Sequence, residues 1–262
     1  MPPVEGVGPS SPPDPTVSIV LATLNEQANL PWLLDRLRAT ALPPLELIVV
    51  DDGSTDGTRE YLRAEATRDP RIRPIFHDGK QTTLKAQCQG ILAAHGRYLV
   101  VMDADRQHPA EILPALVHEL EGGVGLAVAS RYAPGGSVGP RTAMRALISR
   151  VAEGTAKLLL SDARRLTDPV SGFFAFRREV FHPIDPNYRG YKLLLFLLVM
   201  NHGRRTAEVG YVFEPRGSGA SKVTEGLSFV RVFLIEVLLA KRLERLLRSE
   251  RRQALPHPEP AR

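Results

Sequence analysis

Short apolar runs alternate with amphipathic stretches along the first half of the chain. The run over 17–21 is rich in β-branched residues, and leucines follow it at helical spacing, at 30, 33, 34 and 37. The same unit recurs, with further strands predicted at 45–50, 72–76, 98–102 and 126–129 and helices predicted from about 57, at 82–94 and at 111–120. Continuous apolar strands that alternate with helices are typical of a parallel sheet covered on both faces. The pattern therefore predicts an α/β fold.

The pattern changes after residue 140. A basic amphipathic stretch is followed by a predicted strand over 172–176, and another strand is expected over 207–213. Helices are predicted at 192–200 and 226–248, the second of them amphipathic with a basic C-terminal end. No run reaches the ~18 uncharged apolar residues of a membrane-spanning helix, so we expect none.

Both ends of the chain differ from its centre in composition. Residues 1–16 contain six prolines and no apolar periodicity, and the tail over 251–262 is again rich in proline. We therefore predict one globular domain over 17–250 between two disordered ends. The N-terminus lacks the basic and apolar regions of a secretory signal, and the single cysteine, Cys88, cannot form an intrachain disulfide. Both features predict a cytoplasmic protein.

The net charge of +5 favours an anionic partner. A nucleotide diphosphate, a lipid phosphate, a membrane surface and a nucleic acid would each satisfy it. The basic residues are spread along helices without interleaved aromatic residues that would stack bases. This distribution disfavours nucleic acid.

Polar side chains follow several predicted strands at the point where each strand ends. Glu26 follows the first strand, Asp52 the second, Asp103 and Asp105 the fourth, and Arg131 the fifth. Ligands bind beyond the carboxyl ends of parallel strands, because those ends meet at one edge of the sheet. We therefore expect these side chains to converge on one site.

The sequence Asp103-Ala104-Asp105 suits a divalent cation. Two carboxylates two residues apart after a buried strand can offer oxygen ligands to Mg²⁺ or Mn²⁺, which typically links such groups to a substrate diphosphate. Gln107 is placed to supply another oxygen. Taken alone, the pair would sooner be turn or helix-capping aspartates before Pro109. The convergence of polar strand ends favours the metal site instead.

Other motifs mainly exclude alternative classes of site. The loop over 52–57 superficially resembles a calcium loop, but Arg63 stands where a bidentate glutamate is required. It is better explained as a turn that caps the next helix, with Asp52 either binding a nucleoside or serving the turn alone. The sequence contains no P-loop, no dinucleotide-binding glycine pattern after the first strand, no nucleophile-elbow serine and no histidines at metal-ligand spacing.

Together these motifs resemble the inverting family 2 glycosyltransferases of the GT-A fold, and specifically the dolichol-phosphate and polyprenol-phosphate mannosyltransferases. The resemblance covers roughly residues 17–240. It is carried by the order and spacing of Asn25-Glu26, 50–58, 103–109, 130–132, 168–174, and Arg216 with Ser221-Lys222. It implies a mainly parallel GT-A (Rossmann-like) sheet flanked by helices, to which the C-terminal amphipathic helix is added.

The resemblance also implies a reaction and a site. A sugar, most simply mannose from GDP-mannose, would pass with inversion to a polyprenyl (dolichyl) phosphate, with Mg²⁺ or Mn²⁺ as cofactor. The substrate-binding residues would be Ala22, Leu24, Glu26, Val50, Asp52, Asp103, Ala104, Asp105, Arg131, Arg216 and Lys222. Asp103, Asp105 and Gln107 would hold the metal, and Asp105 and Arg131 would be catalytic. A phosphate acceptor is already ionised near neutral pH, so its attack needs alignment and charge screening more than a general base.

Several positions depart from the family pattern. Ala22 and Leu24 stand where proline and tyrosine are common, which weakens ring stacking on the donor base. Arg106 stands where a leucine commonly follows the second aspartate. Phe196 replaces a frequent glutamate in the apolar segment after 190–192.

Two alternatives remain at this point. One is a related family 2 transferase that uses UDP-glucose or another donor, or a different acceptor. The other is a catalytically silent, membrane-associated binding subunit, which the intact motif residues disfavour. We expect the protein to bind peripherally at the cytoplasmic face of a membrane, through the segment 227–252. That segment would equally serve as a core-packing helix.

Overall fold

A single sheet of seven strands forms the centre of the computed structural model, which describes residues 15–139, 143–185, 190–218 and 227–254. The strand order across the sheet is β3-β2-β1-β4-β6-β5-β7. The strands are β1 Val17–Thr23, β2 Leu45–Asp51, β3 Ile72–Phe76, β4 Tyr98–Asp103, β5 Leu126–Ser130, β6 Phe174–Arg177 and β7 Thr206–Gly210. The mainly parallel sheet predicted from the sequence is therefore present.

The strand β6 is the antiparallel member of the sheet, pairing in that sense with both β4 and β5. Val101 of β4 and Val128 of β5 both stand opposite Phe174, the first residue of β6. Because β6 runs the opposite way, the segment before it lies at the edge where the parallel strands end. Asp168 and Gly172 reach the polar edge of the sheet in this way.

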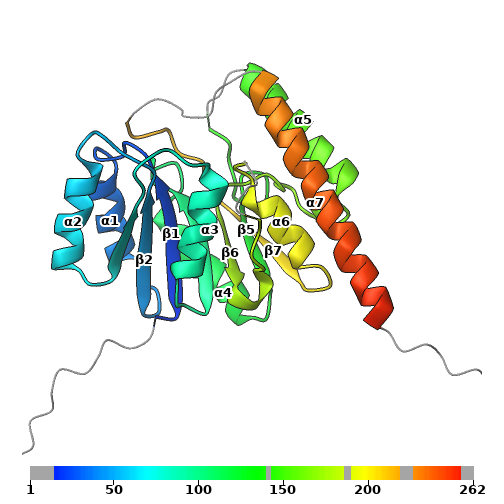
Figure 1. Ribbon diagram of the computed structural model, residues 1–262, viewed down its shortest axis with the longest axis horizontal. Helices are drawn as coiled ribbons and strands as arrows, with labels where there is room; N and C mark the ends of the chain where they lie inside the picture. The colour runs from blue at the N-terminus through cyan, green and yellow to red at the C-terminus, as the bar shows by residue number, and fades with distance from the viewer. Residues whose placement is uncertain (1–14, 140–142, 186–189, 219–226, 255–262) are drawn as a thin grey trace, which may run out of the picture.

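Helices cover both faces of the sheet, and Figure 1 shows two of them, α5 and α7, side by side beyond one end of it. The helices α1 Leu30–Ala39, α2 Thr58–Arg68 and α4 Leu113–Glu121 contribute to the core on one face. The helices α3 Thr83–Ala93, α5 Ala143–Leu159, α6 Leu193–Met200 and α7 Leu227–Ala254 contribute to the core on the other. Among the described residues, short 3₁₀ turns lie at Ala110–Ile112, Asp162–Arg165 and Arg178–Val180.

The central strands are buried on both faces, as their unbroken apolar sequences predicted. In β1, Ile19 and Leu21 join the core beneath α1, whereas Val20 between them joins the core beneath α3. The helix α6 is buried along its whole length, from Leu193 to Met200. It packs against α7, so the inner face of α7 completes the core on that side.

Most element boundaries agree with the sequence patterns to within a few residues. The strand β7 ends at Gly210 because the next residues pair with a loop instead: Ser137 donates to the Tyr211 carbonyl and Phe213 donates to the Ser137 carbonyl. The helix α7 continues to Ala254, so the first residues of the expected 251–262 tail are helical. The first proline after α7 begins is Pro256, and the residues before it are good helix formers. The predictions for 1–14 and 255–262 lie outside the described residues.

Within the described residues, every helix is too short or too polar to cross a membrane.

A close approach between α3 and β1 depends on Gly90. A Cβ atom at this position would overlap the Val20 Cγ1 atom and lie 3.2 Å from the Val50 Cγ2 atom. Gly90→Ala should therefore destabilise the protein by about 1–3 kcal/mol, because the overpacking outweighs the gain in helix propensity. Urea unfolding measures the change. The matched control is Gly154→Ala in α5, where a Cβ meets open space and the same substitution should stabilise by about 0.5–1 kcal/mol. Equal effects at the two glycines would contradict this packing.

Candidate functional site

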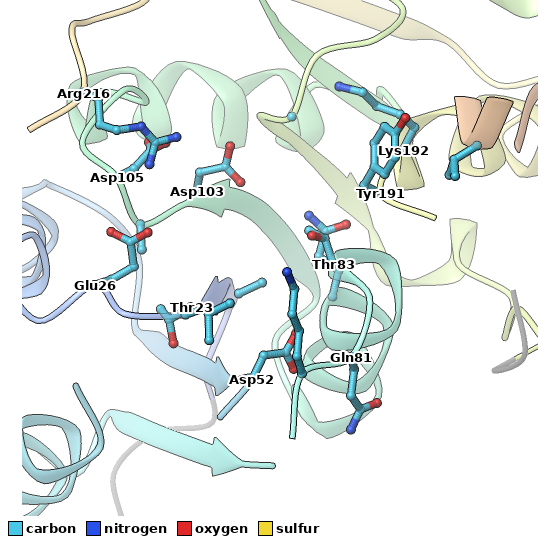
Figure 2. Close-up of a pocket in the computed structure, with 17 residues that line it drawn as sticks. Thr23, Glu26, Asp52, Gln81, Thr83, Asp103, Asp105, Tyr191, Lys192 and Arg216 are labelled. Atoms are coloured by element: carbon cyan, nitrogen blue, oxygen red, sulfur yellow. The ribbon is translucent and has the colours of Figure 1, made fainter. Parts of the chain in front are cut away.

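A cavity of about 340 Å³ opens at the carboxyl edge of the parallel strands. Among the residues predicted from the sequence, those that line it are Ala22, Leu24, Glu26, Asp52, Asp103, Ala104, Asp105 and Arg216. Figure 2 shows Glu26, Asp105 and Arg216 on one side of the cavity, with Asp52 lower in the view. The strand ends of β1, β2 and β4 therefore meet at one pocket, as the topology required.

The loops after β1 and β2 are tied together by a short polar network. Asn25 has a left-handed backbone with φ of 53°, a conformation that asparagine tolerates. Its backbone N–H donates to the Ser54 hydroxyl at 2.8 Å, and its side-chain oxygen accepts from the Thr55 N–H at 2.8 Å. The next residue, Glu26, accepts from the Asn29 amide at 2.6 Å. This network fixes the position of the Glu26 carboxylate, which lines the pocket.

The two aspartates at the end of β2 have different surroundings. Asp51 is fully buried, accepts from the backbone N–H groups of Gly53 and Ser54, and pairs with the Arg59 guanidinium at 3.0 Å. It shapes the turn. Asp52 lines the pocket, where one carboxylate oxygen lies 3.0 Å from the His77 Nδ1 atom. Burial raises the pKa of Asp52. The sequence left Asp52 either binding a nucleoside or serving the turn. In the structure Asp51 serves the turn, and Asp52 faces the pocket.

The end of β4 places two carboxylates beside one cation. Asp105 is buried, and its Oδ2 atom lies 2.6 Å from the Arg216 guanidinium. Burial and the charge of Asp103 both raise the pKa of Asp105. The Asp103 side chain is about half exposed and faces the pocket. A pair of crowded carboxylates in a partly desolvated site is an arrangement that a cation stabilises.

Behind these carboxylates lies a buried histidine, His108. Its ring stacks on Phe173 with 4.9 Å between centroids, and burial lowers its pKa to about 4. The ring is therefore neutral near pH 7. Its Nδ1 atom accepts from the Asp103 backbone N–H at 2.9 Å, so the proton resides on Nε2. His108 thus supports the backbone of the motif without adding charge.

The residues present fit a hard divalent cation. Mg²⁺ prefers a few carboxylate oxygens, with water and substrate phosphates completing its ligands. Asp103 and Asp105 supply two carboxylates at the pocket. Gln107 does not line the cavity itself; its amide nitrogen donates to the Glu214 carbonyl at 3.2 Å. The described residues contain no group of three or more His, Cys, Asp or Glu side chains suited to a metal, so a cation here would depend on a substrate for part of its ligands.

Arg106, which departs from the family pattern, has a structural explanation. Its backbone is left-handed with φ of 70°, and its guanidinium lies 5.3 Å from the Trp32 ring centroid while donating to the Ala28 carbonyl. The Gly217 N–H donates to the Asp105 carbonyl at 3.2 Å. Arg106 therefore joins the motif to the loop before α1, at the cost of a strained backbone next to the carboxylates.

Some residues predicted for the site lie elsewhere. Arg131 forms a two-point ion pair with Asp168, at 2.7 and 2.9 Å, and neither residue lines the cavity. Burial opposes the charge of Arg131, but the Asp168 carboxylate raises its pKa above the ordinary range. Val50 is buried within the sheet. Lys222 lies outside the described residues. The structure thus brings most of the predicted set together and separates Gln107, Arg131 and Val50 from the pocket.

Other residues of the pocket went unrecognised in the sequence. Those that line it are Thr23, Lys80, Gln81, Thr83, Gln87, Gly172, Tyr191, Lys192 and Val232. They come from segments far apart in the chain, which only the fold brings together. One signal was available for Lys192, a lysine directly before the fully apolar segment 193–200. Lysine is rarely buried unless it is paired, so a lysine at the start of a buried helix points to an anionic partner or ligand.

Comparison with known proteins gives a consistent result. Residues 18–184 match the model of the family described as glycosyl transferase family 2. A dolichol-phosphate mannosyltransferase of Pyrococcus furiosus is 37% identical over 209 residues, covering 79% of this chain and 59% of that protein. A dolichol-phosphate mannosyltransferase of Saccharomyces cerevisiae is 33% identical over 219 residues, covering 79% of this chain and 80% of that protein. The chain thus spans about three fifths of the Pyrococcus relative.

Solved structures with the same fold include glucosyl-3-phosphoglycerate synthase from Mycobacterium tuberculosis. Its complex with Mn²⁺, UDP-glucose and phosphoglyceric acid superposes with a TM-score of 0.67 at 23% identity, covering 87% of this chain and 80% of that chain. At this identity the likeness concerns the fold. The fold, the converging strand ends and the family match lead to one conclusion: the chain belongs to glycosyl transferase family 2 and is a glycosyltransferase similar to the dolichol-phosphate mannosyltransferases.

Proposed function

We propose that this glycosyltransferase transfers mannose from GDP-mannose to a polyprenyl phosphate, with inversion at the anomeric carbon. The observation that carries the proposal is the meeting of Asp103, Asp105 and Arg216 with Glu26 and Asp52 around one pocket. The names of relatives that are 31–37% identical support the choice of sugar and acceptor.

The two sides of the pocket suggest how the donor lies. Glu26 and Asp52 offer carboxylates to the hydroxyl and N–H groups of a nucleoside. Asp103 and Asp105 would hold Mg²⁺ or Mn²⁺, which when bound stabilises the charge of the departing diphosphate. Gln107, which does not line the pocket, is no longer included among the metal ligands. Arg216 lies beside these carboxylates and is placed to contact the same phosphates. In this proposal Lys222 adds a further positive charge.

The chain's own residues orient the reactants more than they move protons. An acceptor phosphate is ionised near neutral pH, so its oxygen attacks the anomeric carbon without prior deprotonation. Asp105 therefore acts electrostatically. Arg131 and Asp168 hold each other in an ion pair outside the pocket lining. In this proposal the pair contributes to the electrostatic field of the pocket without contacting the donor. Arg131 is thus better assigned a supporting role than direct contact with the phosphates.

A second donor deserves direct comparison. Ala22 and Leu24 line the pocket without an aromatic ring to stack on the donor base, so base selection has little visible basis there. UDP-glucose is the specific alternative, because it is bound by a structure of the same fold.

A membrane-facing surface is proposed for α5 and α7. The outer face of α7 exposes Val230, Leu234, Ile235 and Leu238, and α5 beside it exposes Leu147, Val151 and Leu158. The inner face of α7 packs in the core through Phe233, Val237 and Ala240. The core-packing interpretation of this segment is therefore met by the inner face, and the outer face is available for the membrane interpretation. We propose that the outer face contacts lipid at the cytoplasmic side of a membrane.

The basic end of α7 is less available than its sequence suggested. Lys241 and Arg248 both pair with Glu244, which is buried. Arg242 and Arg245 are exposed. Exposed arginines near an anionic surface contribute about 1 kcal/mol each, so electrostatics here supplements the apolar contact.

The donor and acceptor are tested by incubating the purified protein with Mg²⁺, farnesyl phosphate and either GDP-mannose or UDP-glucose. GDP-mannose should give GDP and a mannosyl phosphate product detected by mass spectrometry, and chelation of the metal should abolish its formation. Faster transfer from UDP-glucose would replace mannose in the proposal. Absence of any transfer would favour the silent binding subunit.

Asp105→Asn tests the metal site. The substitution removes a negative charge from the pocket while retaining the side chain's size, so transfer should fall by about 100-fold or more with the fold intact. The rate of product formation measures the loss, and circular dichroism monitors the fold. Asp35→Asn on the exposed surface of α1 is the control and should leave the rate unchanged. Near-normal turnover of the Asp105 variant would remove this residue from the chemistry.

The lipid surface is tested with Leu234→Glu combined with Leu238→Glu. Both leucines are exposed on α7, so the protein should fold while its sedimentation with vesicles containing anionic lipid decreases severalfold. Higher salt should weaken the wild-type interaction further. Leu92→Glu, at an exposed leucine on α3, is the control. Equal vesicle binding by both variants would exclude α7 as the contact.

A further inference from the structure

Lys192 occupies a part of the pocket that the donor site leaves unexplained. It lines the cavity at the start of α6, across from Glu26 and Arg216 in Figure 2. Its Nζ atom donates to the Val170 carbonyl at 2.8 Å. An ammonium group has three donors, so it can hold this carbonyl and still donate to a ligand.

The surroundings of Lys192 are ionic and largely desolvated. Burial lowers the pKa of Lys192, and the charge of Arg131 lowers it further, whereas Asp168, Glu236 and Asp103 oppose the shift. A buried cation is costly unless an anion stabilises it. An incoming phosphate would supply that stabilisation at the pocket.

The other cations around the pocket are less suited to an acceptor. Among the described lining residues these are Lys80 and Arg216. Arg216 is paired with Asp105 on the donor side, and Lys80 is exposed on the loop before α3. Lys192 instead lies next to α7, whose Val232 also lines the pocket.

An acceptor of this reaction has a charged head and an apolar chain, and the wall near Lys192 suits both. On α7, Val232 lines the pocket, and Ile235, three residues later and so on the same side of the helix, is exposed. A phosphate at Lys192 would therefore leave its chain beside apolar surface. A donor phosphate needs no such neighbour.

Glu236 of α7 holds the lysine's backbone in place. Its Oε1 atom accepts the backbone N–H groups of Tyr191 at 2.6 Å and Lys192 at 2.8 Å. A Cβ atom at Gly190 would overlap this carboxylate, so the close approach requires glycine. The Gly190 carbonyl in turn accepts from the Leu84 N–H of α3 at 3.0 Å. The segment 190–192 is thus fixed between α3 and α7.

We propose that Lys192 binds the phosphate of the lipid acceptor and that Glu236 is the positioning residue that sets its place. The inference rests on the proposed function and deepens it, by assigning the acceptor's charged head to the wall formed by α6 and α7.

Lys192→Met tests the binding role. At saturating donor, its KM for farnesyl phosphate should rise roughly tenfold to hundredfold, the range for loss of one charge-assisted hydrogen bond. Calorimetry should show the same loss in farnesyl phosphate binding without donor, while GDP affinity stays within twofold of wild type. The matched control is Lys157→Met, since Lys157 also donates to a backbone carbonyl, that of Thr167 at 3.4 Å, but lies outside the pocket.

Glu236→Ala and Glu236→Gln test the positioning role. The glutamine oxygen can still accept the two N–H groups, so Glu236→Gln should keep an acceptor KM near wild type, whereas Glu236→Ala should raise it severalfold with unchanged GDP affinity. Thermal unfolding of all variants separates this effect from a general loss of stability, which would move donor and acceptor parameters together.

The outcomes distinguish this inference from the proposed function. If the wild type transfers mannose and Lys192→Met has the acceptor KM of Lys157→Met, the assignment of Lys192 is wrong and the function stands. A loss of GDP affinity instead would place Lys192 on the donor side and overturn the assignment. If the wild type transfers no sugar, the function fails, and farnesyl phosphate binding still decides the matter: a wild type that does not bind it also overturns the role of Lys192.

Discussion

Two carboxylates share the end of β4, and the ion pair between Asp105 and Arg216 makes this crowding tolerable. Asp105 is buried beside the charge of Asp103, and an unpaired carboxylate in that position would be costly. Arg216 supplies the partner from the segment after β7. The same segment gives the Gly217 N–H to the Asp105 carbonyl and receives the Gln107 amide at Glu214. The need of Asp105 for a cationic partner thus fixes the path of the segment 214–217, after β7, along the pocket.

The rest of the pocket is arranged around that fixed point. The networks at Asn25 and Asp51 hold the ends of β1 and β2, and the neutral, buried His108 supports the turn from behind without adding another charge. The antiparallel direction of β6 brings Asp168 and Gly172 to the same edge. Each of these interactions fixes the backbone at the end of a strand. The side chains of Glu26, Asp52 and Asp103 therefore line the cavity.

The strands and most of the site followed from the sequence because both depend on local order. Runs such as 98–102 are apolar throughout, and a parallel sheet then forces the residues after each strand to one edge. That argument found Glu26, Asp52, Asp103 and Asp105. It also placed Arg131 at the site, but could not show that Arg131 turns to Asp168, a residue 37 positions away.

Lys192 and Glu236 escaped for a related reason. Their relation depends on how α7 packs against α6, and an amphipathic pattern shows which face of a helix is apolar without showing what that face covers. The boundary of α7 was misjudged because proline-rich composition was assigned to residues that precede the first proline, Pro256. The sequence predicted the types of most elements, but it did not predict the contacts between distant segments.

The division of the pocket between early and late parts of the chain has an evolutionary consequence. Glu26, Asp52, Asp103 and Asp105 lie inside the region matched by the family model, 18–184, whereas Lys192, Val232 and Glu236 lie beyond it. The part of the pocket that carries the four carboxylates and the wall beside α7 are therefore separate stretches of one chain. Under the proposed function, exchange of the late stretch alone could give a descendant a new acceptor without rebuilding the donor half, so acceptor choice is the property free to diversify within this architecture.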